Sequence, residues 1–234
     1  MTFFDKCLDG AALFALNQGE ICTCPSRLLV QESIADRFIE RVVERSKRIK
    51  LDHRLDPETM VGTHASRDQH EKILNYIQIG RDEGAEVLIG GAAHTHSDGL
   101  EEGFYVQPTL IKGHNKMRVF QEEIFGWVAS VATFKDQAEA IEIANDTLYG
   151  LGAGVWTRDE HQLYHVPRAI KAGRVWVNCY HNYPAHAPFG SYKKSGFGRE
   201  NHKMMLDHYR NNKNMLISYD KKAVGFLKAK KRKG

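Results

Sequence analysis

The stretch SVATFKDQAEAIEIANDTLYGLGAGVWT, residues 130–157, decides the fold class of this chain. It begins with SVATF, a β-branched apolar run that is typical of a buried strand. DQAEAIEIAND then has the composition of a helix, and GAGVWT is typical of a second strand. A helix over 159–171 and the strand RVWVN at 174–178 continue the alternation. Apolar strands that alternate with helices predict an α/β fold, with a mainly parallel sheet and flanking helices.

The pattern extends toward the N-terminus. Apolar residues at helical spacing predict helices over 4–16, from 34 to about 50, and over 67–79. SRLLVQ at 26–31 and GFYVQPTLI at 103–111 are expected to be strands. Because the second of these contains a proline, which cannot donate to a ladder, we expect it near an edge of the sheet.

Length and composition exclude several classes of protein. A chain of 234 residues, 42% apolar and 26% charged, can bury a core in one or two domains. It contains no apolar run long enough to span a membrane and no recognisable signal peptide. The net charge of +4 comes from residues 219–234, which hold seven Lys or Arg and one Asp. A basic tail could bind phosphates weakly in low salt, but no aromatic platform accompanies it, so we expect no specific nucleic-acid partner.

The four cysteines do not form a disulfide pattern, and they indicate a reducing, cytoplasmic location. Cys22 and Cys24 are close in sequence, but no second pair of ligands follows them. A structural zinc site needs four ligands, so we expect no metal.

Cys22 is the candidate nucleophile. It lies in NQGEICTCPSR, residues 17–27, where a helical run ends at a Gly turn before an apolar strand. A thiol at such a turn can meet a substrate while nearby backbone N–H groups face a developing oxyanion. The alternative is a small buried core residue, which is the usual state of a cysteine.

Three further segments strengthen the interpretation of this stretch. They are QEEIFGWV at 121–128, YGLGAGVWTRD at 149–159 and RVWVNCYHNYPAHAPFGSYKKSGFGRE at 174–200. In order and spacing, the four segments resemble the C-terminal, catalytic-domain half of the aldehyde dehydrogenase superfamily, over residues 1 to about 219. The NCYH-YPAH version is most similar to the bacterial acetaldehyde dehydrogenase subgroup. The N-terminal Rossmann-type domain of the family, its LELGGK glutamate base and its oxyanion asparagine have no match here.

The resemblance implies roles for particular residues. Cys22 would form a thiohemiacetal and then a thioester, while NAD or NADP accepts the hydride. Glu123 and Phe125 match residues that hold the nicotinamide ribose, and Tyr183 and Phe189 match aromatics that line the substrate funnel. Alternatively, Glu123 is a solvated charge beside a core Phe125, and Tyr183 and Phe189 are ordinary core residues.

Other positions are more ambiguous. Gln69 and Lys72 fall near ribose-side positions of the family, or form an exposed helix face. Glu20 is close to Cys22, but the family places its base elsewhere. Trp127 replaces the proline of the family's FGPV, which puts the geometry of that turn in question. His181 has no catalytic counterpart in the family.

The sequence as a whole predicts three regions: a catalytic domain at 1–199, a C-terminal helix and oligomerisation strand at 200–219, and a disordered basic tail at 220–234. The implied function is NAD(P)-dependent oxidation of a small aliphatic aldehyde to its acid, with this chain supplying the nucleophile and being inactive alone. The implied partners are further copies of the chain, or the missing N-terminal half, and no membrane. The alternative is a non-catalytic fragment that acts as an assembly module through NMLISY, 214–219.

Overall fold

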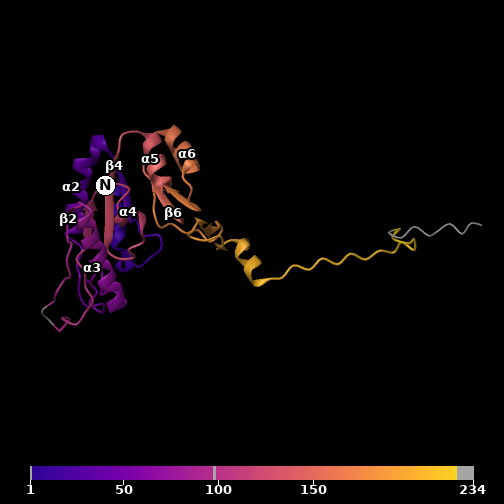
Figure 1. Cartoon of the computed structure of the whole chain (residues 1–234), viewed down its shortest axis with the longest axis horizontal. Coiled ribbons are helices and arrows are strands. Elements are labelled where there is room, and N and C mark those ends of the chain that lie inside the picture. Colours follow the sequence, from indigo (N-terminus) through magenta and orange to yellow (C-terminus); the bar gives the residue numbers. More distant parts are fainter. Residues whose placement is uncertain (1, 97–98, 226–234) are drawn as a thin grey trace, which may run out of the picture.

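The computed structural model describes residues 2–96 and 99–225, which form two lobes followed by an extended C-terminal segment (Figure 1). The elements of the first lobe, in chain order, are α1 (Phe3–Ala12), the 3-10 helix η1 (Leu13–Gly19), β1 (Arg27–Gln31), the 3-10 helix η2 (Glu32–Ile34), α2 (Ala35–Ser46), α3 (Arg67–Asp82), β2 (Glu86–Ile89), β3 (Thr109–Lys112), α4 (Arg118–Gln121) and β4 (Val128–Phe134). The second lobe contains α5 (Gln137–Asn145), β5 (Tyr149–Gly150), β6 (Gly152–Val155), α6 (Glu160–Ala169), β7 (Arg174–Val177), β8 (Phe189–Gly190), β9 (Tyr192–Lys193) and β10 (Arg199–Glu200).

The first lobe is built on a four-stranded sheet with the order β1-β4-β3-β2. β4 pairs in parallel with both β1 and β3, whereas β2 pairs antiparallel with β3. The mainly parallel sheet predicted from the apolar runs is therefore confirmed. GFYVQPTLI was expected near an edge, and β3 lies next to the edge strand β2, with a neighbour on each side. Pro108 is tolerated since it precedes the first paired residue of the strand.

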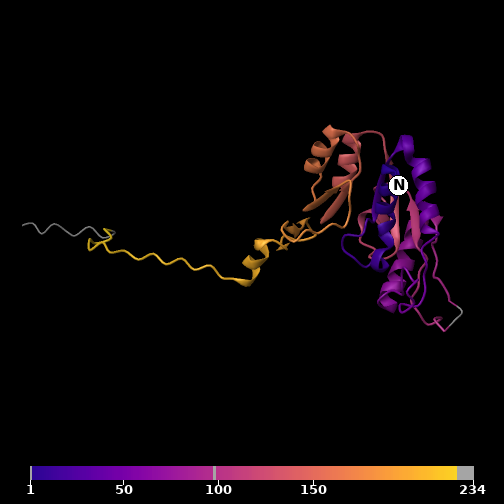
Figure 2. The ribbon, with the colours of Figure 1, turned by 180° about the vertical axis from the view of Figure 1, so that it is seen from behind.

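Helices cover both faces of this sheet, as the alternation of side chains along β3 and β4 shows. Leu110 and Ala129 belong to the apolar cluster with α1 and α2, whereas their neighbours Ile111 and Val128 belong to the cluster with α3 and α4. Successive residues of a strand point to opposite faces, so the central strands β3 and β4 carry apolar side chains on both faces. Figure 2 shows the two lobes from behind.

The second lobe repeats the strand–helix–strand pattern on a smaller scale. β6 and β7 pair in parallel, with α6 as the connection between them. Asp159 caps α6 by accepting a hydrogen bond from Gln162 N. Pro167 lies inside this helix, which ends two residues later at Ala169, in keeping with the lost backbone donor.

Arg27, at the start of β1, joins the two lobes. Its Nη2 donates to the carbonyl oxygen of Ile143 at 2.7 Å and to Asn115 Oδ1 at 2.6 Å. Asn115 in turn donates to Asp146 Oδ2 at 2.6 Å. The Arg27 guanidinium adds hydrogen bonds to carbonyls at the C-terminal end of α5, and this fixes the second lobe against the first strand of the sheet.

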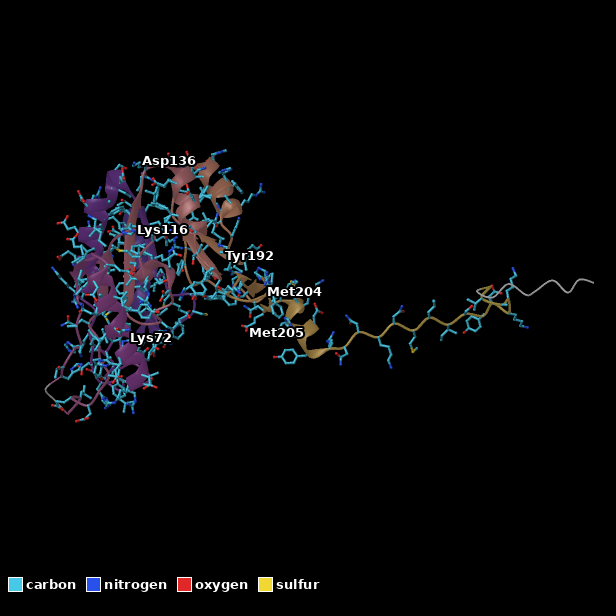
Figure 3. All side chains as sticks on the ribbon, in the orientation of Figure 1. Lys72, Lys116, Asp136, Tyr192, Met204 and Met205 are labelled. Atoms are coloured by element: carbon cyan, nitrogen blue, oxygen red, sulfur yellow. The ribbon has the colours of Figure 1, made fainter. Side chains whose placement is uncertain are left out.

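The C-terminal segment differs from expectation. A 3-10 helix, η3 (Lys203–Tyr209), replaces the helix predicted over 200–210. Residues 214–219 are exposed and pair with no strand of the described chain, so the strand predicted there does not form within a single copy. The segment leaves the second lobe near Met204 and Met205 (Figure 3), and residues 226–234 of the predicted tail lie outside the described part. Among the described helices, none combines the length and hydropathy needed to cross a bilayer.

Candidate functional site

Cys22 lies in a tight turn between η1 and β1. The chain reverses through Asn17, Gln18 and Gly19, whose φ angles are 50°, 61° and 69°. At Gly19 an added Cβ would lie 2.3 Å from the backbone carbonyl of Gly126, so a residue with a side chain cannot occupy this position. The nucleophile turn, residues 17–24, is therefore in direct backbone contact with the turn that follows Phe125.

Of the two cysteines in the nucleophile turn, only Cys22 is exposed. The Cys24 thiol is half-buried and lies 3.5 Å from the carbonyl oxygen of Leu16, to which it can donate. Burial raises the pKa of Cys24 to about 11. The turn itself is closed by a hydrogen bond from Cys24 N to Ile21 O at 3.0 Å. The local geometry thus presents the Cys22 thiol to solvent and keeps the neighbouring thiol protonated.

A cavity of about 780 Å³ brings Cys22 together with Glu123 and Phe125. Its walls also include residues of α1, β1, β6 and α6, so it lies between the two lobes. Glu123 is exposed, and Phe125 adopts a left-handed backbone with φ 61°. The sequence-predicted nucleophile and the two sequence-predicted ribose contacts therefore share one cavity.

Gln69, on α3, stabilises the strained backbone at Phe125. Its Nε2 donates to the carbonyl oxygens of Ile124 and Phe125 at 3.0 and 2.6 Å. The sequence suggested either a ribose-side role or an exposed helix face for Gln69. The structure instead uses this side chain to hold the turn that carries the two ribose candidates. Lys72, also on α3 (Figure 3), lies 6.0 Å from the ring of Tyr76.

The two glutamates of the EEIF segment have different environments. Glu122 accepts hydrogen bonds from the Arg118 guanidinium at 2.8 and 2.9 Å and from Tyr76 Oη at 2.7 Å. The Arg118 hydrogen bonds, followed by that of Tyr76, lower the pKa of Glu122 to about 2. Both glutamates line the cavity, but Glu122 is held by Arg118 and Tyr76, which leaves Glu123 as the exposed carboxylate.

Trp127 occupies a fully buried position in the core. Its ring centroid lies 4.7 Å from that of His64, and its carbonyl oxygen accepts a hydrogen bond from Thr109 N at 2.8 Å. The indole packs in the apolar cluster beneath α3, where proline would leave a large void.

Glu20 turns away from the cavity. Its carboxylate accepts a hydrogen bond from Ala65 N at 3.2 Å, and it is not among the cavity-lining residues. His64 Nδ1 lies 3.4 Å from Glu20 Oε1. Burial lowers the pKa of His64 to about 4 and raises the pKa of Glu20. Because the imidazole is neutral at pH 7, this contact is not an ion pair, and Glu20 connects the nucleophile turn to the loop before α3.

Tyr183 and Phe189 do not line the cavity that holds Cys22. They form an aromatic cluster with Trp176, in which the Tyr183 ring centroid lies 5.3 Å from Phe189 and 5.4 Å from Trp176, both edge to face. Tyr183 Oη is 2.7 Å from Thr23 Oγ1, one residue beyond the candidate nucleophile. The aromatic cluster therefore reaches the nucleophile turn through Thr23.

Asn178 has a structural role at the end of β7. Its side-chain amide exchanges two hydrogen bonds with the backbone of Thr157, at 3.0 and 2.8 Å. In the described residues, no group of three or more His, Cys, Asp or Glu side chains has the arrangement of a metal site.

Comparison with known proteins shows the family to which the chain belongs. The profile of the aldehyde dehydrogenase family matches residues 5–215. The chain belongs to this family. The aldehyde dehydrogenase of Deinococcus radiodurans is 65% identical over 225 residues, and acetaldehyde dehydrogenase 2 of Cupriavidus necator is 63% identical over 225 residues. Each comparison covers 96% of this chain and 44% of the relative, so the chain spans less than half the length of these curated relatives.

Solved structures of aldehyde dehydrogenases have the same fold. Betaine aldehyde dehydrogenase of Staphylococcus aureus, determined with NAD⁺, superposes with a TM-score of 0.92 at 37% identity. The superposition covers 96% of this chain and 45% of that enzyme. The resemblance drawn from the four sequence segments, including the partial coverage, is thus confirmed.

The sequence did not predict that two residues of this aldehyde dehydrogenase chain hold the turns of the candidate site in place. Gln69 was considered only as a ligand contact or an exposed residue, and Thr23 was not considered. The one available signal for Thr23 was its position beside Cys22 in a turn that must be held rigid. Its hydroxyl contacts lie 158 and 160 residues away in the chain, which no local pattern reveals.

Proposed function

We propose that this chain is the nucleophile-bearing part of an NAD(P)-dependent aldehyde dehydrogenase that oxidises a small aliphatic aldehyde to its carboxylic acid. The observation that carries the proposal is the cavity in which the exposed Cys22 meets Glu123 and Phe125. Family membership supports it, as do relatives that are named acetaldehyde dehydrogenases.

The chemistry assigned to Cys22 suits a thiol. The thiolate adds to the aldehyde carbonyl and gives a thiohemiacetal, whose carbon must then lose a hydride to become a thioester. Water releases the acid and returns the thiol, which is both a strong nucleophile and a competent leaving group. Backbone N–H groups of the nucleophile turn are the donors that this chain can offer to the developing oxyanion.

The cofactor-side residues fit a nicotinamide nucleotide. An exposed carboxylate at Glu123 can accept hydrogen bonds from a ribose diol, and the Phe125 ring, fixed by Gln69, can form an apolar wall. When bound, the nicotinamide supplies the hydride acceptor. Tyr183 and Phe189 are proposed as the aromatic wall on the substrate side, which favours apolar aldehydes over hydrated or charged ones.

Acylation by an activated ester tests the role of Cys22 without a cofactor. We expect 4-nitrophenyl acetate to give a burst of one 4-nitrophenolate per chain, with the acetyl group on the Cys22 peptide in mass spectrometry. The Cys22→Ala variant should lose the burst, and Cys24→Ser should retain it as the matched thiol control. A burst that persists in Cys22→Ala would remove the proposed nucleophile.

A second proposal, a non-catalytic assembly module, is favoured by one observation. Met215, Leu216 and Ile217 are 73%, 93% and 66% exposed, which is unusual for apolar residues in a row. An extended apolar segment with unpaired backbone groups can add to the sheet of another copy. We propose that the chain forms homo-oligomers through this segment, whether or not it is catalytic.

A further inference from the structure

Thr23 receives contacts from three side chains of the loop that follows β7. Tyr180 Oη donates to the Thr23 carbonyl oxygen at 3.0 Å, and His181 Nε2 lies 3.1 Å from the same oxygen. The Thr23 hydroxyl lies 3.2 Å from His181 Nε2 and 2.7 Å from Tyr183 Oη. Thr23 is 3% exposed, so these contacts are shielded from water.

The chemistry of the groups fixes the direction of the hydrogen bonds to the Thr23 carbonyl. A carbonyl oxygen only accepts, so the contact with His181 is satisfied when its Nε2 carries a hydrogen. That hydrogen is shared between the carbonyl oxygen and the hydroxyl oxygen of Thr23. The Thr23 and Tyr183 hydroxyls form a further hydrogen bond in which either can donate, so the carbonyl and the hydroxyl of Thr23 are both paired.

The other side of Thr23 is equally constrained. A Cβ added at Gly152 of β6 would lie 3.5 Å from the Thr23 Cγ2 methyl group, which shows that this methyl packs against the strand. The side chain therefore places its methyl on β6 and its hydroxyl on the 180–183 loop. Valine would keep the methyl contact and lose only the hydroxyl.

We propose that Thr23 is a positioning residue, which fixes the peptide after Cys22 to the 180–183 loop and so sets the thiol and the aromatic wall in one geometry. The nucleophile turn is attached at both ends: by Glu20 to the loop before α3, and by Thr23 to the aromatic cluster. Because its hydroxyl is paired with Thr23, Tyr183 is held against the residue that follows Cys22.

This inference rests on the proposed role of Cys22 and is tested on the same full chain. Four variants carry the test: Thr23→Val, Thr23→Ser, Tyr183→Phe and the double variant Thr23→Val/Tyr183→Phe. The readout is the burst with 4-nitrophenyl acetate, separated into the acylation rate constant and the saturation constant. Thr109→Val is the matched control, because Thr109 is also a buried threonine with a paired hydroxyl, on β3 and away from the aromatic cluster.

We expect Thr23→Val to lower the acylation rate constant about fivefold, the equivalent of one net hydrogen bond, with little change in the saturation constant. Thr23→Ser should restore the rate, and Tyr183→Phe should lower it by a similar factor. The double variant should be no slower than the slower single variant, since both remove the same contact. Thr109→Val should acylate at the parent rate.

The outcomes separate this inference from the proposed function. If Cys22→Ala loses the burst while Thr23→Val acylates at the parent rate, the positioning role is wrong and the nucleophile stands. Additive effects of Thr23→Val and Tyr183→Phe would also overturn it. If Thr23→Val does not fold, as judged by circular dichroism, Tyr183→Phe and Thr23→Ser decide: a parent rate in Tyr183→Phe overturns the proposal.

Discussion

The four cysteines are expected to react with iodoacetamide in an order set by burial. Cys22 is exposed at the nucleophile turn, whereas Cys7, Cys24 and Cys179 are half-buried. Burial raises the pKa of both Cys7 and Cys24 from the usual 9.0 to about 11. Alkylation proceeds through the thiolate, so a raised pKa and a covered sulfur both slow it.

The magnitude follows from the pKa values. At a pH of about 8, a thiol with a pKa of about 11 is ionised in roughly one molecule in a thousand, which is about a hundredfold below a thiol with the usual value. Partial burial of the sulfur lowers the rate further. We therefore expect Cys7 and Cys24 to be alkylated about a hundredfold more slowly than a thiol with the usual pKa, and the exposed Cys22 to be modified first.

The assay is a time course of brief iodoacetamide treatment, quenched and mapped by peptide mass spectrometry on protein shown to be folded. Between pH 8 and pH 9, the slow rates at Cys7 and Cys24 should rise about tenfold, because both thiols remain far below their pKa. Modification of Cys7, Cys24 or Cys179 ahead of Cys22 would refute the reasoning and remove the nucleophile assignment.

Further predictions concern stability, activity and assembly. Burial lowers the folded-state pKa of His64 from 6.5 to about 4, so acidification from pH 6.5 to pH 4 protonates His64 in the unfolded chain first and should remove up to about 3 kcal/mol of unfolding free energy. In urea titrations, the unfolding free energy of His64→Gln should depend less steeply on pH, and an unchanged dependence would contradict this. Trp127→Ala should lower the unfolding free energy by ~3–5 kcal/mol, since it empties a fully buried site, and a loss below about 1 kcal/mol in the same titrations would show that the site collapses. The pure chain should give no steady NADH production with acetaldehyde, because it contains no match to the family's glutamate base, and loss of a general base alone lowers the reaction rate ~10²–10⁴-fold. Steady NADH production that the Cys22→Ala variant abolishes would disprove this. Removal of residues 212–234 should reduce self-association in light scattering, whereas removal of 221–234 should not, and a monodisperse full-length monomer would end the idea.

Sequence reasoning identified what depends on local pattern. The apolar runs of β4 and β7 and the helices between them follow from periodicity, and α5 and α6 appear within two residues of their predicted ends. The exposure of Cys22 follows from the Gly turn before it. These features are dictated by residues close in sequence, so a single sequence can reveal them.

Features that depend on distant contacts were predicted less well. GFYVQPTLI was expected near an edge because it contains a proline. β3 does lie next to the edge strand β2, but Pro108 falls just outside the ladder, so the position of β3 is set by its pairing with β2 and β4. The sequence left open how Trp127 affects its turn, and the structure shows the indole packed in the apolar cluster with α3. Tyr183 was predicted to line the substrate pocket, and its role remains a proposal. The structure adds that it reaches the nucleophile turn through Thr23, a residue 160 positions away.

The contact between Gly19 and Gly126 has a consequence for how this chain can change. The two backbones approach so closely that neither turn can move toward the other without displacing it. A ligand that moves the segment around Phe125 would therefore push directly on the nucleophile turn, with no side chain as intermediary. In a library that randomises both turns, we expect the effect of a substitution at one to depend strongly on the residue at the other. Engineering cofactor preference through this segment would then alter thiol reactivity as well.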